Sequence, residues 1–464
     1  MREYYITIND ALRAGLKPEI KVPKNSPFLS ECYGYKVGRL GLEGIPGLTN
    51  PVPDTVVLSY SWPFPQFLLG ERYRILVVRN SFTVEDDVYS LSEDYSTATH
   101  VFSVDALTFG QGTLMELADF GEYAFMTNGV IMIWWSATLG GWDKATSIAT
   151  IPMMSTVCNF KGQMIGGCVQ SVWHDCDEKS IVWSDIGSAD FTPGRGNEAG
   201  YRRDLYGGEV YHVRRLGDNV IVYSSKGITK MFPVFSPAAT FGFKELHNRG
   251  LLNRGAMDGD LNEQVFVDSD YVIWKIDNSG INRVGYQGYM DNLTNDDVIV
   301  SHDPNEEDFY FSDGVKTYLL SPKGLSEHPS YASAVWYDQL LYGLPATDED
   351  STTMPYVKSD VIDMGYAGEK TIFTIEVDIK GTEVAVEYRS RRKDEFKRTP
   401  FKPVNDVGVA SILIAGVEFK IIVRSLEFEL LTEGPDYITV RWKMTDLRGL
   451  RGIYAAPPRG QNVN

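Results

Sequence analysis

The stretch that decides the fold is Val220-Ile-Val-Tyr-Ser-Ser-Lys-Gly-Ile-Thr-Lys-Met231, in which two apolar runs flank a polar turn ending in glycine. Short apolar runs closed by turn residues are the signal of an antiparallel hairpin. Residues 265–274 and 309–318 have the same arrangement, and residues 123–134 and 181–185 contain related runs. The sequence therefore predicts repeated units of strand, tight turn and strand.

The turns of these runs fall near Gly129, Asp185, Gly227, Asp270 and Gly314, so the steps between them are 56, 42, 43 and 44 residues. This spacing is close to the period of about 40–45 residues expected of four-stranded propeller blades. The first step is long, as if it held an insertion. Helical periodicity is nearly absent, apart from one or two expected turns at 113–118. An unspecific run of hairpins is the alternative to a propeller.

The two ends of the chain differ from this repeat. Glycine and proline interrupt residues 1–70 so often that we predict an extended N-terminal arm, whose apolar residues need a partner. Residues 71–345 form the propeller-like domain. In residues 356–450 apolar and polar positions alternate cleanly, for example at Ile375 and Val377, which predicts a small antiparallel sandwich. Residues 451–464 form a C-terminal tail rich in Gly, Pro and Asn.

The predicted fold class is thus all-β: a β-propeller or partial propeller followed by a small antiparallel β-sandwich, with extended N- and C-terminal arms. The 464 residues include 12% aromatic side chains, which argues against disorder. The four cysteines are too few for a disulfide framework and indicate free thiols in a reducing compartment. We find neither a signal-peptide run nor an apolar run that could span a bilayer, so no membrane insertion is expected.

Charge is unevenly distributed along the chain. The net charge is −18, from 62 acidic and 44 basic residues, while residues 389–460 alone carry +5. One set of acidic residues could line a lumen: Glu85, Asp86, Asp87, Asp296, Asp297, Glu306, Glu307 and Asp308. One basic loop could form a subunit interface through Arg389, Arg391, Arg392, Lys393, Lys397 and Arg398. Each cluster can also be a solvated surface; the functional reading is that opposite patches meet between head-to-tail neighbours of a ring.

Motifs for catalysis or cofactors are missing. The chain has no G-x-S-x-G, no H-E-x-x-H and no phosphate-binding G-x-x-x-x-G-K-[ST]. His174-Asp-Cys-Asp177, six residues after Cys168, fits no standard zinc spacing and is read as a polar loop between two strands. The Asp pairs at 258–260 and 268–270 lack the ligand spacing of a calcium loop and are read as turns. We predict no catalytic residue, no metal, no cofactor and no enzyme activity.

Several stretches resemble the propeller-bearing tail hub or nozzle proteins of short-tailed bacteriophages. In the propeller-like region they are Asp119-Phe-Gly-Glu-Tyr123, Thr127-Asn-Gly129, residues 182–191 and residues 219–228. In the closing sandwich they are Val361-Ile-Asp-Met-Gly365, residues 371–378, Gly416-Val-Glu-Phe-Lys-Ile421 and residues 441–449. The resemblance covers about residues 110–450. It lies in the general character of these stretches, not in a diagnostic motif.

The resemblance implies a structural virion protein, assembled in the bacterial cytoplasm and located in the virion tail. It implies six copies in a ring that forms the DNA exit channel and contacts adaptor or portal-proximal proteins and fibre or needle proteins. An acidic lumen would let double-stranded DNA pass without holding it, because it repels the phosphates. The basic loop, which would grip DNA in a lumen, is therefore placed at a subunit interface or on the outer wall.

Two other functions stay open. A carbohydrate-binding tail adhesin would present Trp or Tyr in an open groove, whereas a ring subunit would hide such residues between copies. A sialidase-like propeller glycosidase would need convergent acids in one pocket. Ser184-Asp-Ile-Gly187 superficially resembles the Ser/Asp turn of sialidases, but it does not recur at the same spacing in the other repeats.

Overall fold

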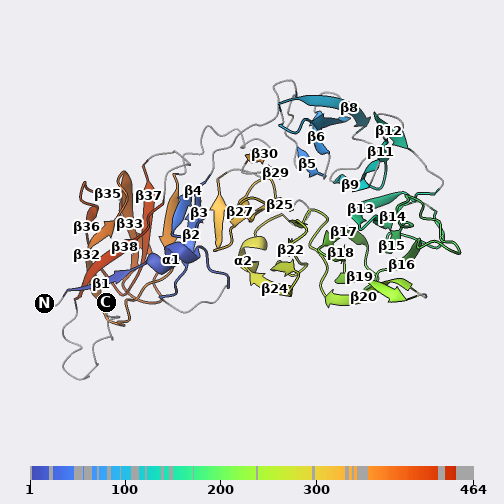
Figure 1. The fold of residues 1–464 in the computed structure, drawn as a ribbon. Coiled ribbons are helices and arrows are strands. Elements are labelled where there is room, and N and C mark those ends of the chain that lie inside the picture. The colour runs from blue at the N-terminus through green and yellow to red at the C-terminus, as the bar shows by residue number, and fades with distance from the viewer. Residues whose placement is uncertain are drawn as a thin grey trace. The chain divides into compact units, whose positions relative to one another are not determined.

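The computed structural model describes residues 3–19, 25–45, 56, 65–70, 73–80, 85–94, 96–105, 114–120, 123–136, 141–145, 150–170, 172–236, 239–294, 298–329, 334–336, 339–341, 354–426 and 434–445. The chain divides into two compact units, coloured by residue number in Figure 1. The propeller unit comprises Leu48–Thr317 and Ser330–Ala346. The sandwich unit comprises Met1–Gly47, Tyr318–Pro329 and Thr347–Asn464.

Five four-stranded antiparallel sheets follow one another along the propeller unit, and in each of them every strand pairs with the next strand of the chain. Sheets I and II contain β5 (Gln66–Leu69), β6 (Arg74–Asn80), β7 (Glu85–Leu91), β8 (Ala98–Asp105), and β9 (Glu116–Phe120), β10 (Tyr123–Thr127), β11 (Met132–Ser136), β12 (Gly141–Ala145). Sheets III and IV contain β13 (Met154–Phe160), β14 (Gln163–Val169), β15 (Ser180–Trp183), β16 (Gly200–Arg203), and β17 (Val210–Leu216), β18 (Asn219–Ser224), β19 (Ile228–Ser236), β20 (Ala239–His247). This is the strand order of propeller blades.

Sheet V is followed by shorter elements of the same unit. Sheet V contains β21 (Met257–Gly259), β22 (Glu263–Val267), β23 (Ile273–Asp277) and β24 (Gly280–Gly285). After it come the short helix α2 (Gln287–Met290) and two hairpins, β25 (Ile299–Asp303) with β26 (Asp308–Ser312), and β29 (Ala334–Trp336) with β30 (Gln339–Leu341).

Consecutive sheets share apolar cores. Val77 of sheet I packs in one cluster with Ile133 of sheet II, and Phe125 of sheet II packs in another with Val157 of sheet III. The same holds from sheet III to IV and from IV to V. Full burial of such a side chain contributes about 1.5–3 kcal/mol, so each sheet depends on its neighbour.

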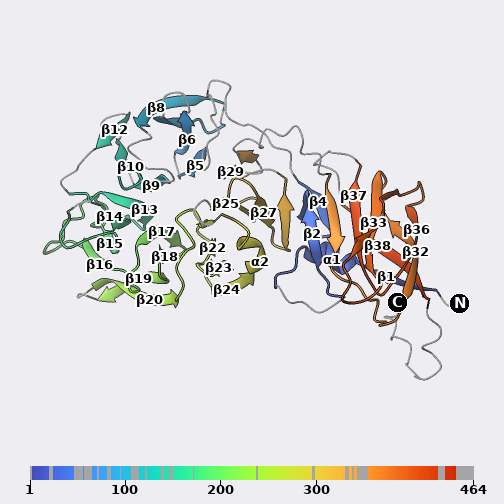
Figure 2. The same cartoon turned by 180° about the vertical axis from the view of Figure 1, so that it is seen from behind.

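The first strands of several neighbouring sheets lie side by side. β5 lies next to β9, β9 next to β13, β13 next to β17, and β21 next to β25. β29 contacts both β25 and β5, which links the last hairpins to sheet I. The order of sheets can be followed from both sides in Figures 1 and 2. The last hairpin of the propeller unit therefore lies against its first sheet.

The sandwich unit contains an antiparallel sheet, a mixed sheet in which β2 (Leu29–Tyr33) and β28 (Leu325–His328) are parallel, and one short hairpin. The first sheet has the order β1 (Tyr4–Thr7), β38 (Ile438–Met444), β32 (Lys370–Val377), β36 (Val409–Gly416). The second sheet joins β28, β2, β31 (Tyr356–Ser359), β37 (Glu418–Ser425) and β33 (Thr382–Arg389), with β34 (Lys397–Arg398) and β35 (Lys402–Pro403) on its edge. The remaining strands are β27 (Thr317–Leu320), which neighbours β28, and the pair β3 (Tyr35–Val37) and β4 (Leu42–Gly44). Ile375, Val377, Val384 and Val386 are buried, which confirms the predicted alternation.

The partner of the N-terminal arm is the sandwich unit of the same chain. β1 pairs with β38, and the ring of Tyr4 stacks on Trp442 with ring centroids 4.9 Å apart. β2 pairs with β31, and the helix α1 (Asn9–Ala14) between them buries Leu12 completely. Residues 1–47 thus supply strands to both sheets, whereas the sequence predicts an extended arm as far as residue 70. Pairing with strands more than 300 residues away is not visible in local sequence.

Two local expectations are wrong. Residues 116–118, expected in a helical turn, begin the strand β9, because sheet pairing with β10 overrides local helical preference. Asp185 was expected in a tight turn between a blade's central strands, but it follows β15 in the long connection 184–199 to β16. The unequal first step therefore reflects the long connections of sheet III.

Within the described part of the chain, no helix has the length and apolar character needed to cross a bilayer. The predicted C-terminal tail, residues 451–464, lies outside the described residues.

Replacing Leu12 tests the attachment of the N-terminal segment. Leu12→Ala should lower the free energy of unfolding of the sandwich unit by about 2–5 kcal/mol, because it leaves a cavity in a closed core. Denaturant unfolding followed by circular dichroism measures this loss. Leu40 is 76% exposed, so Leu40→Ala is the matched control and should stay within about 0.5 kcal/mol of wild type. Equal effects of both changes would show that Leu12 is not held in a core.

Candidate functional site

A charged cluster joins the first strands of three consecutive sheets, II to IV. We call it the inner-strand cluster: Glu116 on β9, Thr156 on β13, and His212 and Arg214 on β17. Arg214 forms a two-point ion pair with Glu116, in which Nη2 lies 2.8 Å from Oε1 and Nη1 contacts Oε2. His212 Nδ1 lies 2.6 Å from Glu116 Oε1. Thr156 Oγ1 accepts from the amide of Val213 at 3.0 Å.

The electrostatics of this cluster favour ionised groups in spite of burial. Glu116 and His212 are buried, while Arg214 keeps partial exposure. Burial alone would raise the pKa of Glu116, but Arg214 and His212 lower it from its ordinary 4.5 to about 2. The pKa of Arg214 is raised by Glu116, although burial acts in the other direction. The other ring nitrogen of His212, Nε2, faces the carbonyl of Arg254, so the ring lies between two acceptors.

A second contact continues this line of polar groups to sheet V and the next hairpin. Asp258 of β21 accepts a hydrogen bond at 2.9 Å from the amide of His302 in β25. Burial raises the pKa of Asp258, while His302 opposes this shift. Polar side chains of the first strands therefore make contacts from sheet II to β25.

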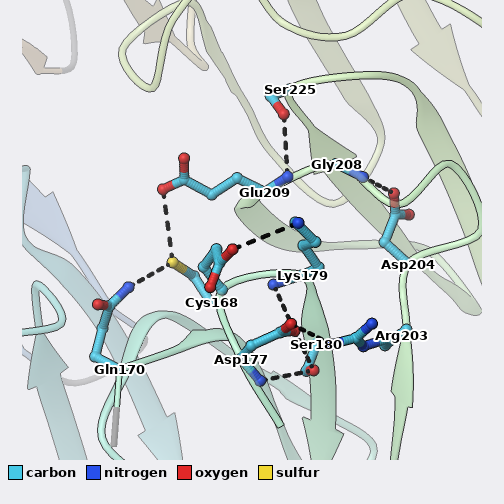
Figure 3. A network of polar contacts seen from close by, with 11 residues as sticks. Cys168, Gln170, Asp177, Lys179, Ser180, Arg203, Asp204, Gly208, Glu209 and Ser225 are labelled. Atoms are coloured by element: carbon cyan, nitrogen blue, oxygen red, sulfur yellow. Dashed lines mark hydrogen bonds and ion pairs between the residues drawn. The ribbon is translucent and has the colours of Figure 1, made fainter.

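The loops between sheets III and IV hold a further polar network, drawn in Figure 3. Cys168 Sγ accepts hydrogen bonds from Gln170 Nε2 at 2.9 Å and from Arg254 Nη2 at 3.2 Å. Arg254 also pairs with Glu209 at 2.5 Å. Asp204 accepts from the amide of Gly208 at 3.2 Å, and burial raises its pKa. Because Cys168 is completely buried, this network serves packing between the two sheets, not attack on a substrate.

The predicted lumen residues do not form one exposed surface. Asp86 is buried and holds Arg79 through contacts of 2.8 and 3.1 Å, and Asp308 is buried in β26. These two residues therefore cannot present charge to a lumen. Asp87 is half-buried and accepts from Ser103 Oγ at 2.6 Å, so its charge is partly engaged within sheet I.

The remaining members of that set differ in exposure. Glu85 is half-buried at the start of β7, and Glu306 and Glu307 are exposed in the turn between β25 and β26. Asp296 and Asp297 lie outside the described residues.

The predicted basic loop divides into two sets. Arg389 and Arg392 contact the completely buried Glu418, with 2.5 Å from Arg389 Nε and 3.5 Å from Arg392 Nε. These two side chains therefore compensate a buried charge inside the sandwich unit. The others are exposed, and we call them the basic strip: Arg391, Lys393, Lys397 and Arg398.

Aromatic rings brace this loop. Phe396 lies beneath the guanidinium of Arg389 at 4.6 Å and the ammonium of Lys420 at 4.9 Å. Phe401 lies beneath Arg424 at 3.7 Å and Arg398 at 5.6 Å. Such cation–π contacts hold the loop in one conformation.

The metal candidates have other roles. Among the residues that the structure describes, no three or more His, Cys, Asp or Glu side chains are placed to hold a metal ion. Asp177 lies in the connection between β14 and β15, as the sequence predicts, and accepts from Ser180 Oγ at 3.0 Å. Asp268 accepts from the indole of Trp274 at 2.7 Å and from the amide of Val272 at 3.0 Å, so it closes the turn between β22 and β23.

Comparisons with known proteins give no family. No protein-family model and no curated protein matches the chain. Among solved structures, a chain of Kuenenia stuttgartiensis hydrazine synthase is similar over 58% of this chain and 80% of that chain, at 12% identity and a TM-score of 0.35. A chain of a mitotic checkpoint complex is similar over 62% of this chain and 86% of that chain, at 11% identity and a TM-score of 0.38. Likenesses of this strength carry no functional inference.

The inner-strand cluster was missed by the sequence analysis. Glu116 and Arg214 are 98 positions apart, and no motif links them. The available signal was His212-Val-Arg-Arg215, a charged run inside an otherwise apolar strand. A charge inside a buried strand requires a partner, but its identity depends on the arrangement of the sheets.

Replacing Glu116 tests the inner-strand cluster. Glu116→Gln should reduce the free energy of unfolding by about 3 kcal/mol, because it leaves the Arg214 guanidinium facing a neutral amide. The value lies at the low end for a broken buried pair, since Arg214 is partly exposed to water. Chemical denaturation measures it. The exposed Glu178 provides the control, and Glu178→Gln should change stability by less than about 0.5 kcal/mol. A loss for Glu116→Gln as small as the control's would contradict the assigned role.

The lowered pKa of Glu116 also predicts a pH dependence. A carboxyl whose folded-state pKa is depressed contributes stability that is fully present above its unfolded value, here about 4.5, and is lost as pH falls towards 2. Urea midpoints measured between these pH values should therefore fall more steeply in wild type than in Glu116→Gln. Parallel pH profiles for the two proteins would show that Glu116 does not titrate in this window.

Proposed function

We propose that the protein is a structural virion subunit of a ring-shaped tail hub or nozzle, through which double-stranded DNA leaves. The observation that carries this proposal is the basic strip, four exposed basic residues on a chain whose net charge is −18. The exposed Asp394 and Glu395 of the same loop offset only part of this positive charge, and an acidic surface would complement the remainder. Other copies of the same acidic chain offer such a surface.

The loop that carries the basic strip is held in place by strand pairing and ring contacts, which favours a contact with another subunit. Lys397 and Arg398 of the strip form β34, which pairs with β33, and the guanidinium of Arg398 lies 5.6 Å from the ring of Phe401. A braced loop loses little conformational entropy on association. Head-to-tail contact between this strip and an acidic face such as Glu306 and Glu307 would generate a closed ring.

The resemblance to tail hub and nozzle proteins supplies the rest of the proposal. Six copies would form the ring, with adaptor or portal-proximal proteins and fibre or needle proteins as partners. Assembly would take place in the bacterial cytoplasm and the product would reside in the virion tail. A carbohydrate-binding tail adhesin and a propeller glycosidase are the competing functions.

The mass of the assembly tests this function. Light scattering on the purified protein, alone and with co-expressed tail proteins, should give a mass near six copies. Charge reversal by Lys397→Glu together with Arg398→Glu should shift the mass towards the monomer, and raised salt should weaken the wild-type ring, because the contact is electrostatic. Lys226→Glu with Lys244→Glu changes the net charge equally on exposed sites of the propeller unit and should leave the ring intact. A monomer under all conditions would refute the ring.

A further inference from the structure

Sheet III carries two connections that are much longer than those of its neighbour. Residues 170–179 join β14 to β15, and residues 184–199 join β15 to β16. In sheet IV, residues 225–227 and 237–238 are sufficient for the same two connections. The long loops of sheet III are therefore not required for strand pairing.

The first of these loops is held firmly in place. The amide of Val169 donates to the carbonyl of Asp177 at 3.1 Å, and the amide of Cys176 donates to the carbonyl of Trp173 at 2.9 Å. Asp177 also binds Arg203 of β16 and Ser180, as Figure 3 shows. The side chains of Trp173 and Cys176 pack against the core between sheets II and III. The loop is thus preorganised rather than loosely attached.

The outer side of this loop presents apolar and aromatic groups to solvent. We call it the ring patch: Val172, Trp173, His174 and Tyr201. Val172 is fully exposed, and Tyr201 of β16 is 41% exposed. The rings of His174 and Tyr201 are nearly parallel, with an interplanar angle of 8° and centroids 5.6 Å apart, and Trp173 meets His174 edge to face at 5.2 Å. The loop 172–179 and the strand β16 therefore present an ordered set of rings, of which His174 and Tyr201 are exposed and Trp173 is half-buried.

The backbone of His174 has an unusual conformation. Its φ is +44°, a left-handed conformation that costs a non-glycine residue free energy. Glycine would fit this position without strain. The histidine at this position instead supplies a ring between Trp173 and Tyr201, so the strained backbone serves to build the set of rings.

We propose that the ring patch binds a neutral oligosaccharide. The faces of aromatic rings attract the weakly positive C–H groups of a sugar. The adjacent carboxylates of Asp175 and Asp177 and the guanidinium of Arg203 can bind sugar hydroxyls. Asp177 and Glu178 are ion-paired with Arg203 and Lys179, so the site has little net charge and suits a neutral sugar rather than an acidic one. A patch of four side chains is also much smaller than the roughly 800 Å² per partner of a stable protein interface, but it matches one or two sugar rings.

Saturation-transfer NMR on the full-length protein tests this site with maltotriose, chitotriose and, as an acidic probe, trigalacturonate. At least one neutral trisaccharide should bind, and trigalacturonate should not. Tyr201→Ala should weaken binding about tenfold or more. His174→Gly removes a ring while relieving the backbone, so it should weaken binding similarly without lowering the melting temperature. Trp173→Ala is less suitable because Trp173 also packs in the core.

Tyr437 of the sandwich unit is the matched control, since it is 42% exposed. Tyr437→Ala should bind the trisaccharide as wild type does. The proposal is overturned if neither neutral probe binds, if Tyr201→Ala and His174→Gly bind as wild type, or if the ring patch instead captures a tail protein. Binding is read on subunits irrespective of their assembly, so a monomeric protein that binds sugar would refute the ring without refuting this site.

Discussion

The contact between Glu116 and the side chains of Arg214 and His212 on β17 is the constraint on which the propeller unit depends. Moving a carboxylate out of water costs several kcal/mol unless a charged partner and hydrogen bonds meet it with good geometry. Glu116 finds the charged partner in Arg214 and a further polar contact in His212, about a hundred positions along the chain. Sheets II and IV must therefore take fixed positions on either side of sheet III. Apolar packing tolerates small shifts between sheets, whereas a two-point ion pair does not.

The repeat could be predicted because the chemistry of its turns is local. Ser224 and Ser312 end the second strand of a unit, Asp268 directly follows one, and all three hold the following turn with a side-chain oxygen. These residues are 44 positions apart. In sheet III the corresponding turn is replaced by a long loop, and the prediction then chose Asp185, one connection too late. The spacing of turn residues therefore predicts the length of the repeat only where the turn between the two central strands of a sheet is short.

Which charged residues are buried and which are exposed could not be predicted. It depends on contacts between residues far apart in the chain, and the local sequence does not contain these. Asp86 and Glu307 both lie in acidic runs, yet Asp86 is buried against Arg79 whereas Glu307 is exposed. Glu418 of β37 forms ion pairs with Arg389 and Arg392 of the basic loop. The basic strip of the same loop stays exposed. A charge run in a sequence therefore describes composition, and only the tertiary structure separates charges that stabilise the fold from charges that can meet a partner.

The two exposed features differ in their physics, and this difference bears on function. In the proposed ring the basic strip would act through charge, which salt screens over about 8–10 Å, and its specificity would come from the opposite surface. The proposed sugar site would act through close contact of aromatic faces, which salt hardly affects and which depends on loops already held in position. The two proposals are therefore compatible in one chain, because strengthening one contact would leave the other unchanged. Salt dependence is the property that separates them in any experiment on the intact chain.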